Sequence, residues 1–116
     1  MKAQGFSRAL TYHLQWKAEL KKFIDGQGSF NIAEISPEEC KFGQWLCSDE
    51  AAEYAPEKEL REICRVHNRL HAIARRVYGQ KMLGNDVTAR KELAKLDASS
   101  MNLASLMTTL KALNNN

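Results

Sequence analysis

Three long stretches of this 116-residue chain repeat apolar residues at alternating spacings of three and four. This spacing places the apolar side chains along one face of an α-helix, and such a face has to pack against other helices. The three faces comprise Phe6, Leu10, His13, Trp16, Leu20 and Phe23; Leu60, Ile63, Cys64, His67, Leu70, His71, Ala74, Val77 and Tyr78; and Ala89, Leu93, Leu96, Ser100, Leu103, Met107 and Leu110. No segment alternates as a strand does, so the sequence predicts an all-α, four-helix-bundle-like fold.

Turn and capping residues predict where the long helices begin and end. The first should stop at the glycine-rich residues 25–29. Pro56 opens the second, which should end near residues 84–85, and Asp86 caps the third. The polar tail, residues 113–116, is expected to be frayed.

A short helix is predicted between the first two long ones. Ser36 suits its N-cap, Pro37 its first helical position, and Glu39 completes a capping box. This helix should carry Cys40 in its first turn and end near residues 46–47. The fold class is therefore three long helices plus a short helix that carries a cysteine.

Composition narrows the possible partners. The chain has 17 basic and 14 acidic residues, and a net charge of +3 is too weak to indicate a nucleic-acid partner. No apolar run approaches the roughly 20 residues that span a bilayer, so neither a membrane segment nor a signal peptide is expected. Three cysteines do not make a disulfide scaffold, which favours the reducing cytoplasm. Residues 1–116 are predicted to form a single domain.

All three histidines lie on the apolar faces, where an imidazole without a partner would lose its hydration uncompensated. Each of His13, His67 and His71 could simply be a core histidine bonded to a carbonyl or hydroxyl group. Together with Cys40, however, they form a complete tetrahedral ligand set for zinc. His67 and His71 stack one helical turn apart, so both could reach one ion. Copper(II) would bind such a set more tightly, and only its scarcity in cells excludes it.

The three cysteines are expected to differ in role. A thiol at the start of a helix is near the positive end of the helix dipole, which favours the Cys40 thiolate as a ligand. Cys47 is expected to be a small buried hydrophobe. Cys64 lies one turn before His67 on the same face and is either a packed core residue, a resolving thiol or a substitute ligand.

Three short motifs occur in a specific order along the chain. They are His13-x-x-Trp16, then Cys40-x-Phe42-Gly43-x-Trp45-Leu46, then His67-x-x-x-His71. The middle motif is specific, and the two histidine motifs gain weight from their order. In this combination the chain resembles the chemoreceptor zinc-binding (CZB) domain family, and with the last helix the resemblance covers essentially the whole chain.

The resemblance implies a helical bundle that binds one zinc ion per protomer through His13, Cys40, His67 and His71. Members of the family are often appended to bacterial chemoreceptors or diguanylate cyclases, and they dimerise. They are thought to sense zinc, or oxidants such as hypochlorous acid, through the cysteine. No signalling domain is attached here, so the chain is either a stand-alone member or an excised domain.

These residues bear on four functions: a zinc hydrolase, a di-iron bundle, a sensor module and a structural zinc site. A zinc hydrolase is disfavoured because Asn68 stands where a His-Glu-x-x-His protease carries its general base. A di-iron bundle needs Glu-x-x-His pairs, which are missing from the sequence. We therefore expect no enzyme but a sensor module, with a structural zinc that staples a partner-docking domain as the rival. In a sensor, oxidation of Cys40 is expected to release the short helix, since few contacts besides the metal should hold it.

Overall fold

The computed structural model describes residues 3–28, 30, 35–36 and 39–114, which form five helices and no strand. Three helices are long: α1 (Ala3–Ile24), α4 (Glu57–Met82) and α5 (Asp86–Asn114). Two are short: α2 (Lys41–Leu46) and α3 (Asp49–Tyr54). The predicted all-α class is confirmed.

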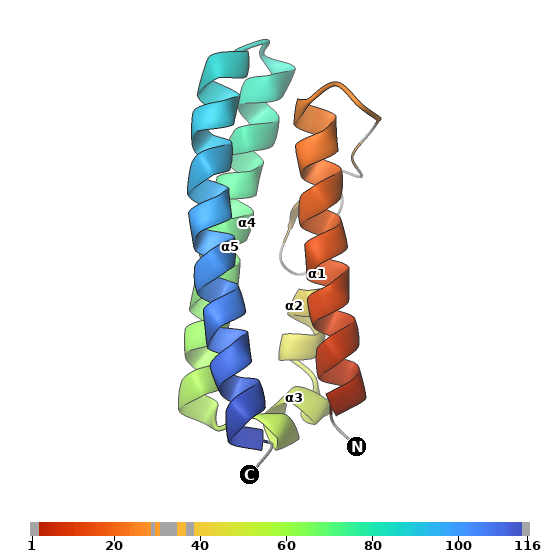
Figure 1. Cartoon of the computed structure of the whole chain (residues 1–116), viewed down its shortest axis with the longest axis vertical. Coiled ribbons are helices and arrows are strands. Elements are labelled where there is room, and N and C mark those ends of the chain that lie inside the picture. The colour runs from red at the N-terminus through yellow and green to blue at the C-terminus, as the bar shows by residue number, and fades with distance from the viewer. Residues whose placement is uncertain (1–2, 29, 31–34, 37–38, 115–116) are drawn as a thin grey trace.

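The three long helices lie side by side and produce an elongated molecule of 48 × 21 × 18 Å. As Figure 1 shows, α4 and α5 form an antiparallel hairpin, and α1 runs beside them in the same direction as α4. The two short helices lie near the end of the molecule where α1 begins, and α2 packs on both α1 and α4. The α2–α3 segment thus takes the place of a fourth helix in the bundle.

The short helices differ from the prediction. Helix α2 begins at Lys41, and its N-cap is Cys40 with extended backbone angles, so Cys40 precedes the first turn instead of lying in it. The predicted cap at Ser36 is wrong; its carbonyl accepts a hydrogen bond from the Glu39 N–H (3.2 Å) in a separate turn. Pro37 lies outside the described residues.

Helix α3 was not predicted. Its N-cap is Ser48, whose hydroxyl accepts a hydrogen bond from the Ala51 N–H at 3.2 Å. Asp49 and Glu50 follow in the first turn, where negative charge favours the helix dipole. A serine followed by two acidic residues is the signal that could have found it.

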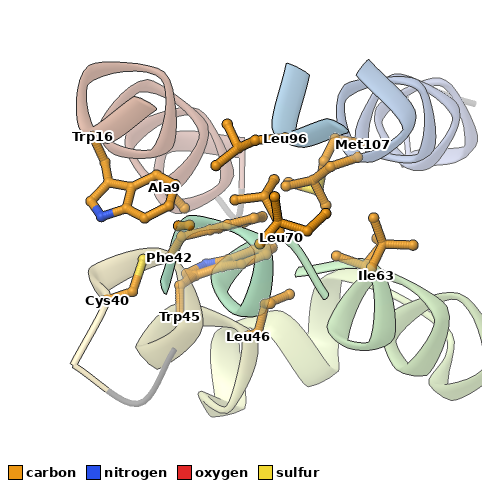
Figure 2. Close-up of a cluster of buried hydrophobic side chains, with 14 of the residues drawn as sticks. Ala9, Trp16, Cys40, Phe42, Trp45, Leu46, Ile63, Leu70, Leu96 and Met107 are labelled. Carbon is orange, nitrogen blue, oxygen red and sulfur yellow. The ribbon is translucent and has the colours of Figure 1, made fainter. Parts of the chain in front are cut away.

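The predicted apolar faces form the core. Every residue of the predicted α5 face is buried, from Ala89 to Leu110. Figure 2 shows Trp16 from α1, Phe42 and Trp45 from α2, and Leu70 from α4 meeting in one cluster. The side chain of Phe6 lies outside the described residues.

Helix α2 is held in the bundle by its own buried side chains. Phe42, Trp45 and Leu46, half of its six residues, are buried, and Phe42 is 0% exposed. The expectation that few contacts besides a metal hold this helix is therefore wrong. Its three buried side chains would have to leave the core before the helix could detach.

Two glycines end helices as the sequence predicted. Gly26 and Gly84 both have a φ of +79°, a conformation that side chains with a Cβ rarely adopt. At each turn the next residue donates a hydrogen bond back across the helix end, Gln27 N–H to the Lys22 carbonyl (2.8 Å) and Asn85 N–H to the Gln80 carbonyl (2.9 Å). These bonds define Schellman motifs, which satisfy carbonyls at the end of a helix.

The C-terminal helix is longer than predicted. It continues to Asn114, two residues into the segment expected to be frayed, and residues 115–116 lie outside the described residues. Among the described helices, none combines the length and the apolar character required to cross a membrane.

The glycine at the α4–α5 turn can be tested against a second glycine five residues earlier. Gly84→Ala should lower the free energy of unfolding by about 1–2 kcal/mol, because alanine is strained at positive φ. Gly79→Ala, inside α4 and with open space for a Cβ, should instead raise it by about 0.5–1 kcal/mol. Urea unfolding of both variants measures the difference, and equal signs would contradict this account of the turn.

Candidate metal centre

Three of the four predicted ligands come together in the core. Cys40, His67 and His71 each offer one donor atom, and these atoms all lie within 4.8 Å of one another. Cys40 and His71 are 0% exposed and His67 is 1% exposed. The cluster joins the residue before α2 to two successive turns of α4, so two different elements supply its donors.

Hydrogen bonds orient the two histidines of α4. The Nδ1 atom of His71 lies 2.9 Å from the carbonyl oxygen of Ile35, and its Nε2 lies 3.1 Å from the Nε2 of His67. A carbonyl only accepts, so Nδ1 of His71 carries the proton and Nε2 presents its lone pair toward His67. Without a metal, His67 then donates from its own Nε2.

The Ile35 carbonyl is a part of the site that the sequence did not reveal. Every residue has a backbone carbonyl, so no residue type signals one that orients a histidine. Such a bond on the second ring nitrogen is the usual support of a metal-binding histidine, because it selects the tautomer and holds the ring.

His13 lies beside the cluster but is not one of its three members. Its ring centroid is 6.4 Å from that of His67, 5.5 Å from that of Phe42 and 5.8 Å from that of Trp16. The side chain is 1% exposed, and among the described residues neither of its ring nitrogens has a hydrogen-bond partner. A buried imidazole without a partner is costly, and a bound metal ion would give one of its nitrogens a partner.

Aromatic side chains surround the histidines. The ring of Trp16 is 4.6 Å from that of His71, and the ring of Phe42 meets His67 edge-on at 5.0 Å. In Figure 2, Trp16, Cys40 and Phe42 lie on the same side of the buried cluster. Trp16 and Trp45 are core residues, as the sequence predicted. The aromatic rings lower the polarity around the donors and restrict their movement.

Burial keeps the imidazoles uncharged. Desolvation, together with the nearby His71, lowers the pKa of His67 from 6.5 to about 3 and that of His13 to about 4. Smaller contributions come from His13 in the first case and Lys17 in the second. Both side chains are therefore neutral near pH 7, the form in which a histidine can bind a metal.

The donor set fits zinc. Two nitrogens that share one tetrahedral zinc ion at 2.0–2.1 Å stand about 3.3 Å apart, close to the 3.1 Å between the Nε2 atoms of His67 and His71. One thiolate and two or three imidazoles also match the borderline softness of this ion. Cys40, His67 and His71 would hold the ion. His13, the remaining predicted ligand, lies beside them and has no other partner among the described residues.

The other two cysteines differ from Cys40. Cys47 is exposed, so its predicted burial is wrong; it is the C-cap of α2 and follows the last buried residue of that helix. Cys64 is half-buried and packs against the core. Within the described residues neither belongs to the donor cluster, so Cys64 is not a substitute ligand in this arrangement.

The lowered histidine pKa values predict a pH-dependent stability of the metal-free protein. A histidine with a pKa of 6.5 in the unfolded chain and about 4 or 3 in the folded protein binds its proton more readily when unfolded. The contribution of these histidines to the free energy of unfolding is therefore fully present above pH 6.5. It decreases as the pH is lowered toward 4, by at most about 1.4 kcal/mol per histidine for each pH unit. Urea unfolding between pH 8 and pH 4 measures the slope, and His13→Phe should make it shallower. A flat profile over this range would contradict the assigned pKa values.

The geometry agrees with a comparison against protein-family models. Residues 13–78, more than half of the chain, match the model described as "Chemoreceptor zinc-binding domain". The matched segment begins at His13 and includes Cys40, His67 and His71. Comparisons with curated proteins and with solved structures gave no significant match. On the strength of the matched segment, this chain belongs to the chemoreceptor zinc-binding domain family.

Proposed function

We propose that this chain is a zinc-binding regulatory module of bacterial signalling, of the chemotaxis or cyclic-di-GMP type. It holds one zinc ion per protomer through His13, Cys40, His67 and His71. The observation that carries the proposal is the buried Cys40–His67–His71 cluster, in which the Ile35 carbonyl turns the Nε2 lone pair of His71 inward. The unpartnered ring of His13 beside it supports the fourth ligand.

The proposed role is regulatory and not enzymatic. Four protein ligands fill the coordination sphere of a tetrahedral ion, which leaves no position for a water molecule or a substrate. A catalytic zinc site keeps one position open. Asn68, between the two histidines of α4, also lacks a group that could act as a general base.

Cys40 is the donor that can respond to a signal. Two histidines are held on the long helix α4, whereas Cys40 precedes the six-residue helix α2. A peroxide would convert its thiolate to a sulfenic acid, transferring one oxygen atom to sulfur and releasing hydroxide, and a sulfenic acid is a poor ligand. Because Cys40 is 0% exposed, the oxidant has to enter through local opening. Since α2 has its own core contacts, the response would be a shift of the Cys40 end of the segment and not the loss of the helix.

The module would pass this change to a chemoreceptor or a diguanylate cyclase in the cytoplasm, where thiols remain reduced.

We also propose that it acts as a homodimer. Exposed apolar side chains, among them Leu83 and Val87 at the α4–α5 turn and Met101 on α5, support self-association. Light scattering of the zinc-loaded protein measures the oligomeric state, and a monomer at micromolar concentration would refute the dimer.

The zinc site is tested by metal content. Wild-type protein should bind one zinc ion per chain, and Cys40→Ala should lower the affinity by more than about 100-fold because a first-sphere ligand is lost. Cys47→Ala is the matched control: it removes an exposed thiol next to the same helix and should leave binding unchanged. His13→Ala should also weaken binding, and cobalt substitution should lose its thiolate charge-transfer band only in Cys40→Ala. Equal zinc affinity of Cys40→Ala and Cys47→Ala would refute the site.

A sensor and a structural staple differ in what happens when the metal is removed. The apolar core extends through all three long helices, so we expect chelation to leave the helical circular dichroism largely unchanged. Hydrogen exchange should then increase mainly in α2 and around His67. A staple would instead unfold on chelation, because its binding free energy is folding free energy.

The oxidant signal is tested on the same protein. In a Cys47→Ser/Cys64→Ser variant, where Cys40 is the remaining thiol, peroxide should release the bound zinc in step with oxidation of Cys40. If zinc stays bound after Cys40 has been oxidised, the oxidant signal is refuted, and the zinc concentration remains as the proposed signal.

A further inference from the structure

Two free cysteines line a pocket beside the candidate metal centre. The pocket has a volume of about 330 Å³ and lies between α2 and α4. Cys47 and Cys64 both contribute to its walls, together with His67 of the donor cluster and Leu46. Cys40 is not among its lining residues. The pocket therefore brings together the two thiols that are not proposed as zinc ligands.

The two thiols differ in exposure and influence each other. Cys47 is exposed at the end of α2, whereas Cys64 is half-buried one turn before His67 on α4. Burial raises the pKa of Cys64, and the nearby Cys47 raises it further. The two cysteines line the same pocket, and the influence of Cys47 on the pKa of Cys64 agrees with this placement.

We propose that Cys47 and Cys64 form a reversible intramolecular disulfide across this pocket, which makes the pair a redox site separate from Cys40. The exposed Cys47 thiolate attacks a peroxide, takes one oxygen atom to become a sulfenic acid, and releases hydroxide. The Cys64 thiolate then attacks the Cys47 sulfur, the S–S bond forms, and the oxygen leaves as hydroxide. The protons given up by the two thiols convert both hydroxides to water. Two thiols and one peroxide thus yield one disulfide and two waters.

The position of the pair gives the disulfide a structural effect. Cys47 follows α2 directly, and Cys64 lies in the N-terminal part of α4, so the bond would tie the end of the short helix to the long one. It would also close the pocket edge three residues from His67. Oxidation at this site therefore restrains α2, whereas oxidation of Cys40 loosens it.

Mass spectrometry and peptide mapping test the proposal. After hydrogen peroxide treatment, non-reducing digestion of the wild-type protein should give one peptide pair linked through Cys47 and Cys64, lighter by two hydrogen atoms than the two free peptides together. Dithiothreitol should restore the two free peptides. Cys40→Ala should form the same link, while Cys47→Ser and Cys64→Ser should not. Because Cys40→Ala removes a proposed zinc ligand, the disulfide can be confirmed or lost independently of zinc binding.

Three results would overturn the proposal. A link between Cys40 and Cys64 would make Cys64 the resolving thiol of the metal-site cysteine. A covalent dimer through Cys47 would show that the exposed thiol reacts with a second chain. Oxidation of Cys47 to a sulfinic acid with no link would show that Cys64 cannot reach it. Mapping the wild type alone separates these results, so the test does not depend on the folding of any variant.

Discussion

The structure is built around the burial of polar donors in an otherwise apolar core. Three imidazoles and one thiol are almost fully removed from water at the junction of α1, the residue before α2, and α4. Each buried nitrogen has to be satisfied by a hydrogen bond or by an ion, or it lowers stability. His71 bonds to the Ile35 carbonyl and to His67, but the described residues offer no partner to His13. A bound cation would satisfy these groups together, since it can accept a lone pair from each imidazole and from the thiolate.

This requirement explains how the helices divide their roles. The α4–α5 hairpin is a long scaffold, and the buried face of α5 is apolar except for Ser100. Helix α1 brings His13 and Trp16 to the scaffold, and an ion pair between Lys17 and Asp97 (3.0 Å) ties it to α5. The α2 segment supplies the sulfur, and Phe42 and Trp45 anchor it in the core. The only thiol among the predicted donors thus stands directly before a helix of six residues.

The family match follows the same division. It runs from His13 in α1 to Tyr78 near the end of α4, and it contains every predicted donor. Helix α5 lies outside the matched residues, yet its packing on α4 covers one side of the core. The chemistry is therefore concentrated in the matched segment, and α5 contributes burial. Cys47 and Cys64 also lie inside the matched segment, and the pocket that they line does not include Cys40.

The sequence alone determined the helical class, the glycine turns that end α1 and α4, and which faces are buried, because periodicity and glycine caps act locally. It also predicted the three residues that the structure brings together: His67 and His71 from their place on an apolar face, and Cys40 from its place before a short helix and its motif. The start of α2, helix α3 and the exposure of Cys47 were mispredicted or missed, because short helices depend on side-chain caps and on packing against distant helices. Only the tertiary structure showed that the Ile35 carbonyl orients His71, that His13 stands beside the cluster, and that Cys64 shares a pocket with Cys47. These contacts join residues far apart along the chain, and local patterns carry no information about how such segments meet.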